Sequence, residues 1–261
     1  VLWLLLGLAG CASTYVTPPP GVSLAEFTDD DLLGYYDKQP VSPFPANLAV
    51  LRVQDSDYYA YSDQRRRNAR YAFITARDIE TDAALQKMNE LPLMGGIAPI
   101  GRLLLPPAAD SVDDLRKPAA QLRADMLLVY TVDTVFTVDG EALGPLSLIT
   151  LGLLPNKRAH VTATVAGILI DVRSGYIYGS TEATAVEDKS ASIWSTELAI
   201  DSARKLAEER AFEAFSNEFG TLWTGVLNSY AATQPARPHG IAAPQTESPA
   251  SSWYRVRLSD D

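Results

Sequence analysis

The chain has a single cysteine, Cys11, and only two histidines, His160 and His239. A lone thiol can form neither an intramolecular disulfide nor a cysteine-based zinc cluster. Two isolated histidines do not give the spacing of a metal site or of a Ser-His-Asp triad, and no nucleophile elbow, H-E-x-x-H helix or phosphate-binding loop is present. The sequence therefore predicts no catalytic residues, no metal and no cofactor. The function of the single thiol, that of Cys11, then has to be explained.

Cys11 closes an apolar run, Val1–Gly10, that ends in the small residues Leu8-Ala9-Gly10-Cys11. This pattern resembles the lipobox of bacterial lipoprotein signal peptides. The resemblance implies cleavage before Cys11 and acylation of its thiol and amine, with palmitate among the usual chains. Several acyl chains on one residue hold a protein on a membrane almost permanently. Because Ala12 and not Asp follows the cysteine, the resemblance implies an anchor in the outer membrane, facing the periplasm.

The alternative is that Val1–Gly10 is a buried strand or helix and that Cys11 is a small core residue. The Pro-rich stretch that follows favours processing instead, and no apolar run reaches the roughly 20 residues of a membrane-spanning helix. We therefore expect four parts, which are a signal peptide over 1–10, a lipidated tether over 11–47, a periplasmic domain over 48–231 and a disordered tail over 232–261.

Charge and composition limit the classes of partner. The net charge is −10, and 47% of the 261 residues are apolar. An acidic chain would oppose binding to nucleic acid through its overall field, so we expect no nucleic-acid partner. The apolar fraction is that of a core-forming globular protein. The membrane is expected as a partner only through the lipid anchor.

Carboxylates on predicted strands leave one enzymatic alternative open. Asp133, Asp171 and Glu182 all fall on such strands, and a pair of carboxylates can perform acid–base catalysis. A periplasmic hydrolase acting on cell-wall or lipid substrates would need a deep pocket with paired carboxylates near Asp133 and Asp171. Strand ends carry carboxylates in most soluble proteins, so the sequence favours a protein that is not an enzyme.

An apolar segment over 143–155 is bracketed by prolines. An exposed apolar patch of this size marks an interaction site, whereas the same segment folded onto its own sheet would be an ordinary connection. Both interpretations stay open. The candidate interaction residues are Leu146, Leu148, Ile149, Leu151, Leu153 and Leu154.

The periodicity of the chain predicts an α+β fold. Short apolar or Val/Thr-rich runs predict strands, and residues 171–178 predict a hairpin whose turn uses Gly175 at positive φ. A long helix is expected from Ser195, with one aromatic stripe buried against the sheet. The expected architecture is a small α/β sandwich with a mixed sheet of about four to five strands, helices packed on it and a long C-terminal helix. The stripe consists of Phe212, Phe215, Phe219, Leu222 and Val226.

This order of elements resembles periplasmic lipoproteins such as the curli-secretion pore lipoprotein and the lipoprotein activators of peptidoglycan synthases. Residues 124–130, 146–157 and 170–183 look more closely like the middle of the uncharacterised rhombotarget-type lipoproteins, in which a buried strand, a loop ending in Pro-x-Asn-Lys and a hairpin follow one another. The resemblance covers about residues 48–230. It implies a fold and a location, and it carries no catalytic residues.

The sequence thus predicts a non-enzymatic, outer-membrane lipoprotein whose periplasmic domain binds or assembles with envelope proteins. A ring-forming export component, a homo-oligomer that uses residues 143–155, is one alternative, and the hydrolase is another. The tail also contains Trp253-Tyr-Arg-Val-Arg-Leu258, which could add a short strand or serve as a docking motif.

Overall fold

The computed structural model describes residues 32–55, 71–106, 109, 111–138, 141–142, 158–190 and 197–233. Cys11 and the six candidate interaction residues between Leu146 and Leu154 lie outside these ranges. So does the tail beyond Thr233.

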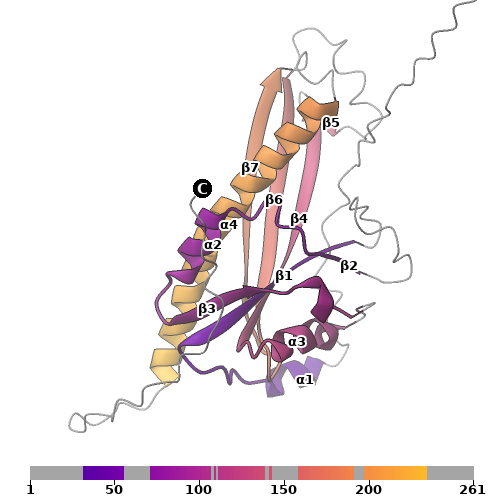
Figure 1. The fold of residues 1–261 in the computed structure, drawn as a ribbon. Coiled ribbons are helices and arrows are strands. Elements are labelled where there is room, and N and C mark those ends of the chain that lie inside the picture. Colours follow the sequence, from indigo (N-terminus) through magenta and orange to yellow (C-terminus); the bar gives the residue numbers. More distant parts are fainter. Residues whose placement is uncertain are drawn as a thin grey trace, which may run out of the picture.

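Seven strands in the described part of the chain form one mixed sheet (Figure 1). The main path has the order β2-β1-β4-β6-β7, while β3 pairs with β1 and β5 pairs with β4. The pairs β1–β3 and β1–β4 are parallel, and all the others are antiparallel. The strands are β1 (Ala46–Asp55), β2 (Tyr71–Ile74), β3 (Met94–Pro99), β4 (Met126–Val138), β5 (Glu141–Ala142), β6 (Arg158–Asp171) and β7 (Ile177–Ser190).

The predicted α+β class and the long C-terminal helix are confirmed. The sheet has more strands than the four to five expected, because one edge of β1 pairs with two short strands in succession. Residues 46–50 of β1 pair with β3, and residues 52–55 pair with β2. The helices are α1 (Leu32–Asp37), α2 (Asp82–Asn89), α3 (Val112–Gln121) and α4 (Glu197–Thr233), with a 3-10 turn at Arg102–Leu104.

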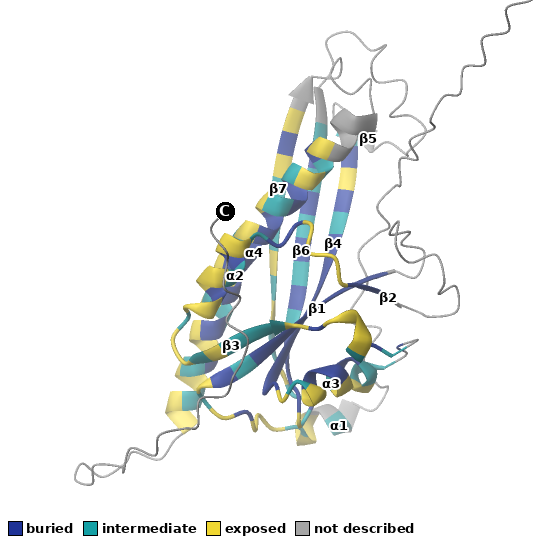
Figure 2. Ribbon diagram, viewed as in Figure 1, coloured by how far each residue is buried: buried dark blue, intermediate teal, exposed yellow. Residues whose placement is uncertain are grey.

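Helix α4 runs along one face of β6 and β7 for most of their length, and α3 covers the opposite face at one end (Figure 1). The predicted aromatic stripe of α4 is buried, with one exception. Leu222 is only half-buried, and its neighbour Trp223 is fully buried instead. Gly167 of β6 makes room for the stripe, since a Cβ there would lie 2.8 Å from Phe215 Cζ. Figure 2 shows buried residues on the inner side of α4 and alternating burial along the long strands.

A second core lies between α3 and the other face of the sheet. Leu115 and Ala119 of α3 pack with Leu127 of β4 and Ile170 of β6. The Ser111 hydroxyl accepts a hydrogen bond from the Asp114 amide and caps the helix as its composition predicts. The helix continues through Pro118, whose side chain is buried and whose missing N–H removes one backbone hydrogen bond.

Candidate functional site

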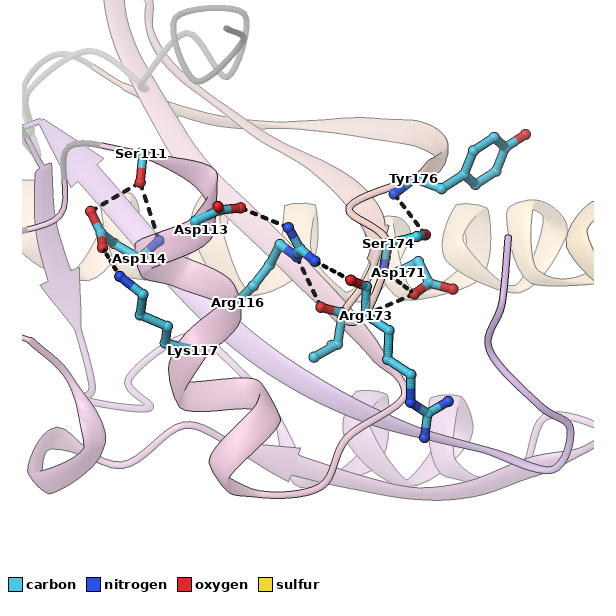
Figure 3. Close-up of polar contacts among 10 residues, drawn as sticks. Ser111, Asp113, Asp114, Arg116, Lys117, Asp171, Arg173, Ser174 and Tyr176 are labelled. Atoms are coloured by element: carbon cyan, nitrogen blue, oxygen red, sulfur yellow. Dashed lines mark hydrogen bonds and ion pairs between the residues drawn. The ribbon is translucent and has the colours of Figure 1, made fainter. Parts of the chain in front are cut away.

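The turn between β6 and β7 depends on Asp171 (Figure 3) and on Gly175. Asp171 Oδ1 accepts hydrogen bonds from the backbone amides of Arg173 and Ser174, at 2.9 and 3.0 Å. Gly175 has a φ of +71°, and a Cβ there would lie 2.9 Å from Arg116 Nη1. Only glycine meets both conditions without strain. The predicted hairpin and the role of its glycine are confirmed.

Arg116 of α3 holds this turn from outside. Its Nε donates to the Val172 carbonyl at 2.9 Å and its Nη2 donates to the Arg173 carbonyl at 2.5 Å. Asp113, one turn earlier in α3, pairs with Arg116 Nη1 at 2.6 Å. The ring of Tyr176 points away from these contacts (Figure 3). The turn is therefore held by α3, while Tyr176, the residue before β7, points away from α3.

The second oxygen of Asp171 binds a segment from the start of the chain. Asp171 Oδ2 accepts from the backbone amides of Val41 and Ser42, at 2.9 and 2.8 Å, and from Tyr178 Oη at 2.9 Å. Ser42 Oγ lies 2.7 Å from the same oxygen and 2.8 Å from the Asp125 carbonyl, so its single proton serves one of two acceptors.

Asp171 is completely buried, yet the carboxylate is the favoured form. Burial alone would raise its pKa, but the hydrogen bonds from Ser174, Ser42, Val41 and Tyr178 outweigh burial and lower the pKa below its usual value. The side chain is therefore a saturated anion that joins two parts of the backbone, with no lone pair directed at a substrate.

Residues 41–47 are thus part of the folded body, although they fall within the expected tether. Asp125 Oδ2 accepts from the Asn47 amide at 3.0 Å, and the Asp125 amide donates to the Asn47 carbonyl at 2.8 Å. The ring of Phe44 packs edge-on against Trp223 and Tyr230, with centroids 5.6 and 4.7 Å away. Proline-rich sequence alone suggested a free linker, whereas two buried carboxylates hold its last residues in place.

These contacts leave an open groove of about 850 Å³ between the segment 39–44, the start of β7 and the last turns of α4. Tyr176 and Tyr178 form one wall, with ring centroids 5.2 Å apart. Phe44 and Tyr230, whose rings are in contact, also line the groove. The remaining lining residues are Gln39, Pro40, Ser42, Leu222, Gly225, Val226, Ser229 and Thr233.

The described residues that line the groove carry aromatic, aliphatic, amide or hydroxyl groups, and none of them is charged. Burial, and after it the hydrogen bond to Asp171, raises the pKa of Tyr178 well above its ordinary value, so its hydroxyl stays neutral. The volume lies within the range of small-molecule sites. Such a surface can bind a neutral, apolar or aromatic group, and it offers no side chain poised for proton transfer.

The carboxylates of the hydrolase alternative do not come together. Asp133 lies opposite Thr164 and Asp171 lies opposite Met126 in the β4–β6 ladder. Seven ladder positions, or about 23 Å, therefore separate them, and Glu182 is exposed on β7. The prediction of a pocket with paired carboxylates near Asp133 and Asp171 is therefore wrong.

A second polar cluster lies inside the fold, between β1, β4 and the residues before α2. Arg52 is 3% exposed and pairs with Asp78 at 2.9 Å, and Tyr130 Oη donates to Glu80. The adjoining cavity is only about 30 Å³, which is roughly the share of one water molecule. We interpret the cluster as structural. Within the described ranges, no group of three or more His, Cys, Asp or Glu residues is placed to bind a metal.

The candidate residues inferred from sequence and those of the groove are different sets. Cys11, Leu146, Leu148, Ile149, Leu151, Leu153 and Leu154 lie outside the described residues. Sequence reasoning missed Ser42, Phe44, Tyr178 and Tyr230, because the groove joins segments far apart in the chain. The alternation of Tyr176 and Tyr178 after the turn was the one local signal. In the described part of the chain, no helix is long and apolar enough to cross a membrane.

No family model and no curated protein matches the chain. Among solved structures, a Xanthomonas campestris protein of the family model DUF330 covers 74% of this chain and 91% of its own, at 15% identity and a TM-score of 0.36. A candidate lipoprotein from Caulobacter crescentus covers 49% of this chain and 90% of its own, at 14% identity and a TM-score of 0.26. A PelC dodecamer from Paraburkholderia phytofirmans covers 69% and 94%, at 11% identity and a TM-score of 0.28. Similarity at this level assigns the chain to no family.

Proposed function

We propose that the chain is a non-enzymatic lipoprotein, anchored through Cys11 in the outer membrane, whose periplasmic body binds an envelope protein. The groove is the observation that carries the binding part of the proposal. Its aromatic walls and neutral hydroxyls suit an apolar or aromatic segment of a partner, and the described lining residues are all uncharged.

The position of the groove also supports a role close to the membrane. Ser42 lines it and lies 31 positions after Cys11 in the sequence. Even a fully extended chain of that length reaches only about 100 Å. A protein held by Cys11 would therefore present the groove to partners within that distance of the bilayer surface.

Replacement of Cys11 tests the anchor. In cells, Cys11→Ser should leave an unprocessed or soluble form, whereas the unchanged chain gains acyl mass and partitions into detergent. If both forms fractionate alike and carry the same mass at this residue, the anchor is wrong. Binding in the groove is a separate part of the proposal and would survive that result.

A photo-cross-linker at Tyr230 tests the groove in intact cells. We expect a discrete envelope protein to be captured, and we expect Ser229→Trp to abolish the capture, because the indole fills the groove from an exposed position of α4. Glu218→Trp is the matched control, since it is exposed on the same helix and does not line the groove. Capture that is equal in all three chains would contradict binding in the groove.

Light scattering of the solubilised protein separates this proposal from the export ring. A homo-oligomer that dissociates on joint replacement Leu148→Asp and Leu151→Asp would favour the ring and count against an accessory binder. A monomer, or an oligomer unchanged by the replacements, would favour the binder. The two leucines belong to the apolar segment over 143–155, and the Tyr230 experiment probes α4, so the two experiments change different parts of the chain.

A further inference from the structure

Strand β7 forms an outer edge of the sheet (Figure 1). It pairs with β6 along almost its whole length, from Ile177 to Ser190, and no strand in the described ranges pairs with its other side. This edge strand has 14 residues. That is long for a free edge, since most proteins keep such edges short or cover them. Every second amide and carbonyl of β7 is therefore available to another strand.

The two faces of β7 differ in chemistry. The even-numbered residues from Ser180 to Asp188 are all exposed on the face away from α4, and this face carries the carboxylates of Glu182 and Asp188. Asp188 pairs with His160 of β6 at 2.5 Å. On the other face, Ala183 and Ala185 point toward α4 and yet stay only partly buried. One face of the edge carries these exposed carboxylates. The other carries the two alanines and, further along, Glu187, which is buried in an ion pair with Arg210 of α4.

The tail contains a segment with the matching alternation. In Trp253–Leu258, the residues Tyr254, Val256 and Leu258 alternate with Arg255 and Arg257. Period-2 alternation puts these two sets on opposite faces of an extended strand. Its basic face would lie beside the carboxylates of β7, while its apolar face would lie beside the alanines under α4. Cross-strand pairs of opposite charge and of apolar side chains both stabilise a sheet.

The connection is long enough. Helix α4 runs antiparallel to β7, because Arg210 pairs with Glu187 and Leu222 lies against Gly179. The end of α4 at Thr233 is 11 residues past Leu222, or about 17 Å. The 19 residues 234–252 can span about 60 Å when extended. The tail can therefore reach the middle of β7 in either direction.

We propose that residues 253–258 pair with the free edge of β7 as an additional strand of the same chain. Arg255 and Arg257 lie on the same face as Glu182, and the apolar residues continue the core under α4. The opposite sign of the two segments makes this occupant preferable to a second copy of β7, whose acidic face would meet its own charge.

Hydrogen exchange of the full chain in detergent, compared with a chain ending at Ser252, tests the pairing. We expect amides within 179–188 to exchange at least about tenfold faster in the shortened chain, while α2 and α3 exchange equally in both and so report an intact fold. Equal exchange of β7 in the two chains would overturn the proposal. Protection of β7 that rises with protein concentration would also overturn it, because the strand would then come from a second copy.

Charge reversal tests whether the basic face of residues 253–258 lies beside the acidic face of β7. Glu182→Arg should weaken the protection of β7, and joint replacement with Arg255→Glu and Arg257→Glu should restore it. Glu218→Arg is the control, because that exposed residue lies on α4 and away from the edge. Exchanging neighbours by Tyr254→Arg with Arg255→Tyr keeps the composition and breaks the alternation, so it should abolish protection. Insensitivity to all of these changes would rule the pairing out.

Discussion

Asp171 Oδ2 and Ser42 Oγ lie 2.7 Å apart, although 129 positions separate the two residues in the chain. The contact ties the segment that enters the fold to the turn between its two longest strands. Both residues are buried, and Ser42 also lines the groove. The shape of the groove therefore depends on one carboxylate.

Replacement of this carboxylate should be costly. Asp171→Asn keeps the size of the side chain but turns one acceptor oxygen into a donor, which leaves several amide and hydroxyl donors without a partner. We expect the free energy of unfolding to fall by about 2–4 kcal/mol, measured by urea denaturation at pH 7. Asp133→Asn, on β4, should change it by less than about 0.5 kcal/mol.

The effect of Asp171→Asn should shrink in acid. The pKa of Asp171 is lower in the folded chain than in the unfolded one, so its contribution to stability is complete above the unfolded value, near 3.9. The contribution is lost as the pH falls through the folded value. Urea titrations from pH 7 to pH 2.5 should show the two chains converging, and a gap as large at pH 2.5 as at pH 7 would refute this account.

Glu208 should have the opposite pH dependence. It is buried on α4, and burial raises its pKa above the ordinary value in spite of Arg204 and the 2.8 Å hydrogen bond from Thr134. The raised pKa means that stability falls as the pH rises from the unfolded value, about 4.3, through the folded value. Glu208→Gln should remove this loss. The free energy of unfolding of the variant, relative to that of the unchanged chain, should therefore be higher at pH 7 than at pH 4. Glu213→Gln, at an exposed position of the same helix, is the control for loss of a carboxylate.

Gly167→Ala should strain the packing under α4. Its Cβ would meet Phe215 Cζ at 2.8 Å and Tyr130 Cβ at 3.1 Å, and overpacking of this kind costs about 1–3 kcal/mol. Phe215→Leu in the same chain should recover part of the loss, because it removes one of the two contacts. Thermal unfolding of the four chains in this cycle gives the coupling, and strict additivity would show that the two residues do not compete for space.

Gly175→Ala should loosen the hairpin turn. A non-glycine residue at a φ of +71° costs about 1–3 kcal/mol, and the new methyl group would displace the Arg116 guanidinium. Gly101→Ala is the control, because nothing lies within 4 Å of its Cβ position. We expect a lower melting temperature for Gly175→Ala alone. Equal melting temperatures would mean that the turn tolerates a side chain.

Local patterns predicted most of the fold. The strand over Met126–Val138 follows the Val/Thr alternation, and the stripe of α4 follows the helical spacing of its phenylalanines. Such patterns could not predict which strands pair with β1, since β2 and β3 are both short and pair with successive parts of the same edge of β1. The packed segment 41–47 was also missed, because prolines indicate only that a helix is absent and not what the chain contacts.

The groove was the least predictable feature. Tyr178 and Tyr230 come from elements more than fifty positions apart, and Phe44 comes from a segment that composition alone described as a linker. Asp171 was singled out in the sequence as a catalytic candidate, and its real partners are backbone amides and hydroxyls. A carboxylate at a strand end has the same appearance in a sequence whether it performs catalysis or holds a loop.

The length of α4 determines how far apart two binding sites on this molecule can lie. With 37 residues the helix is about 55 Å long, and the 14-residue strands beneath it span about 45 Å. The groove lies at one end of this helix, and Ala142 and Arg158, the described residues on either side of the apolar segment 143–155, belong to strand ends at the other. Two proteins bound at these two ends would be held further apart than the thickness of a bilayer's hydrocarbon core.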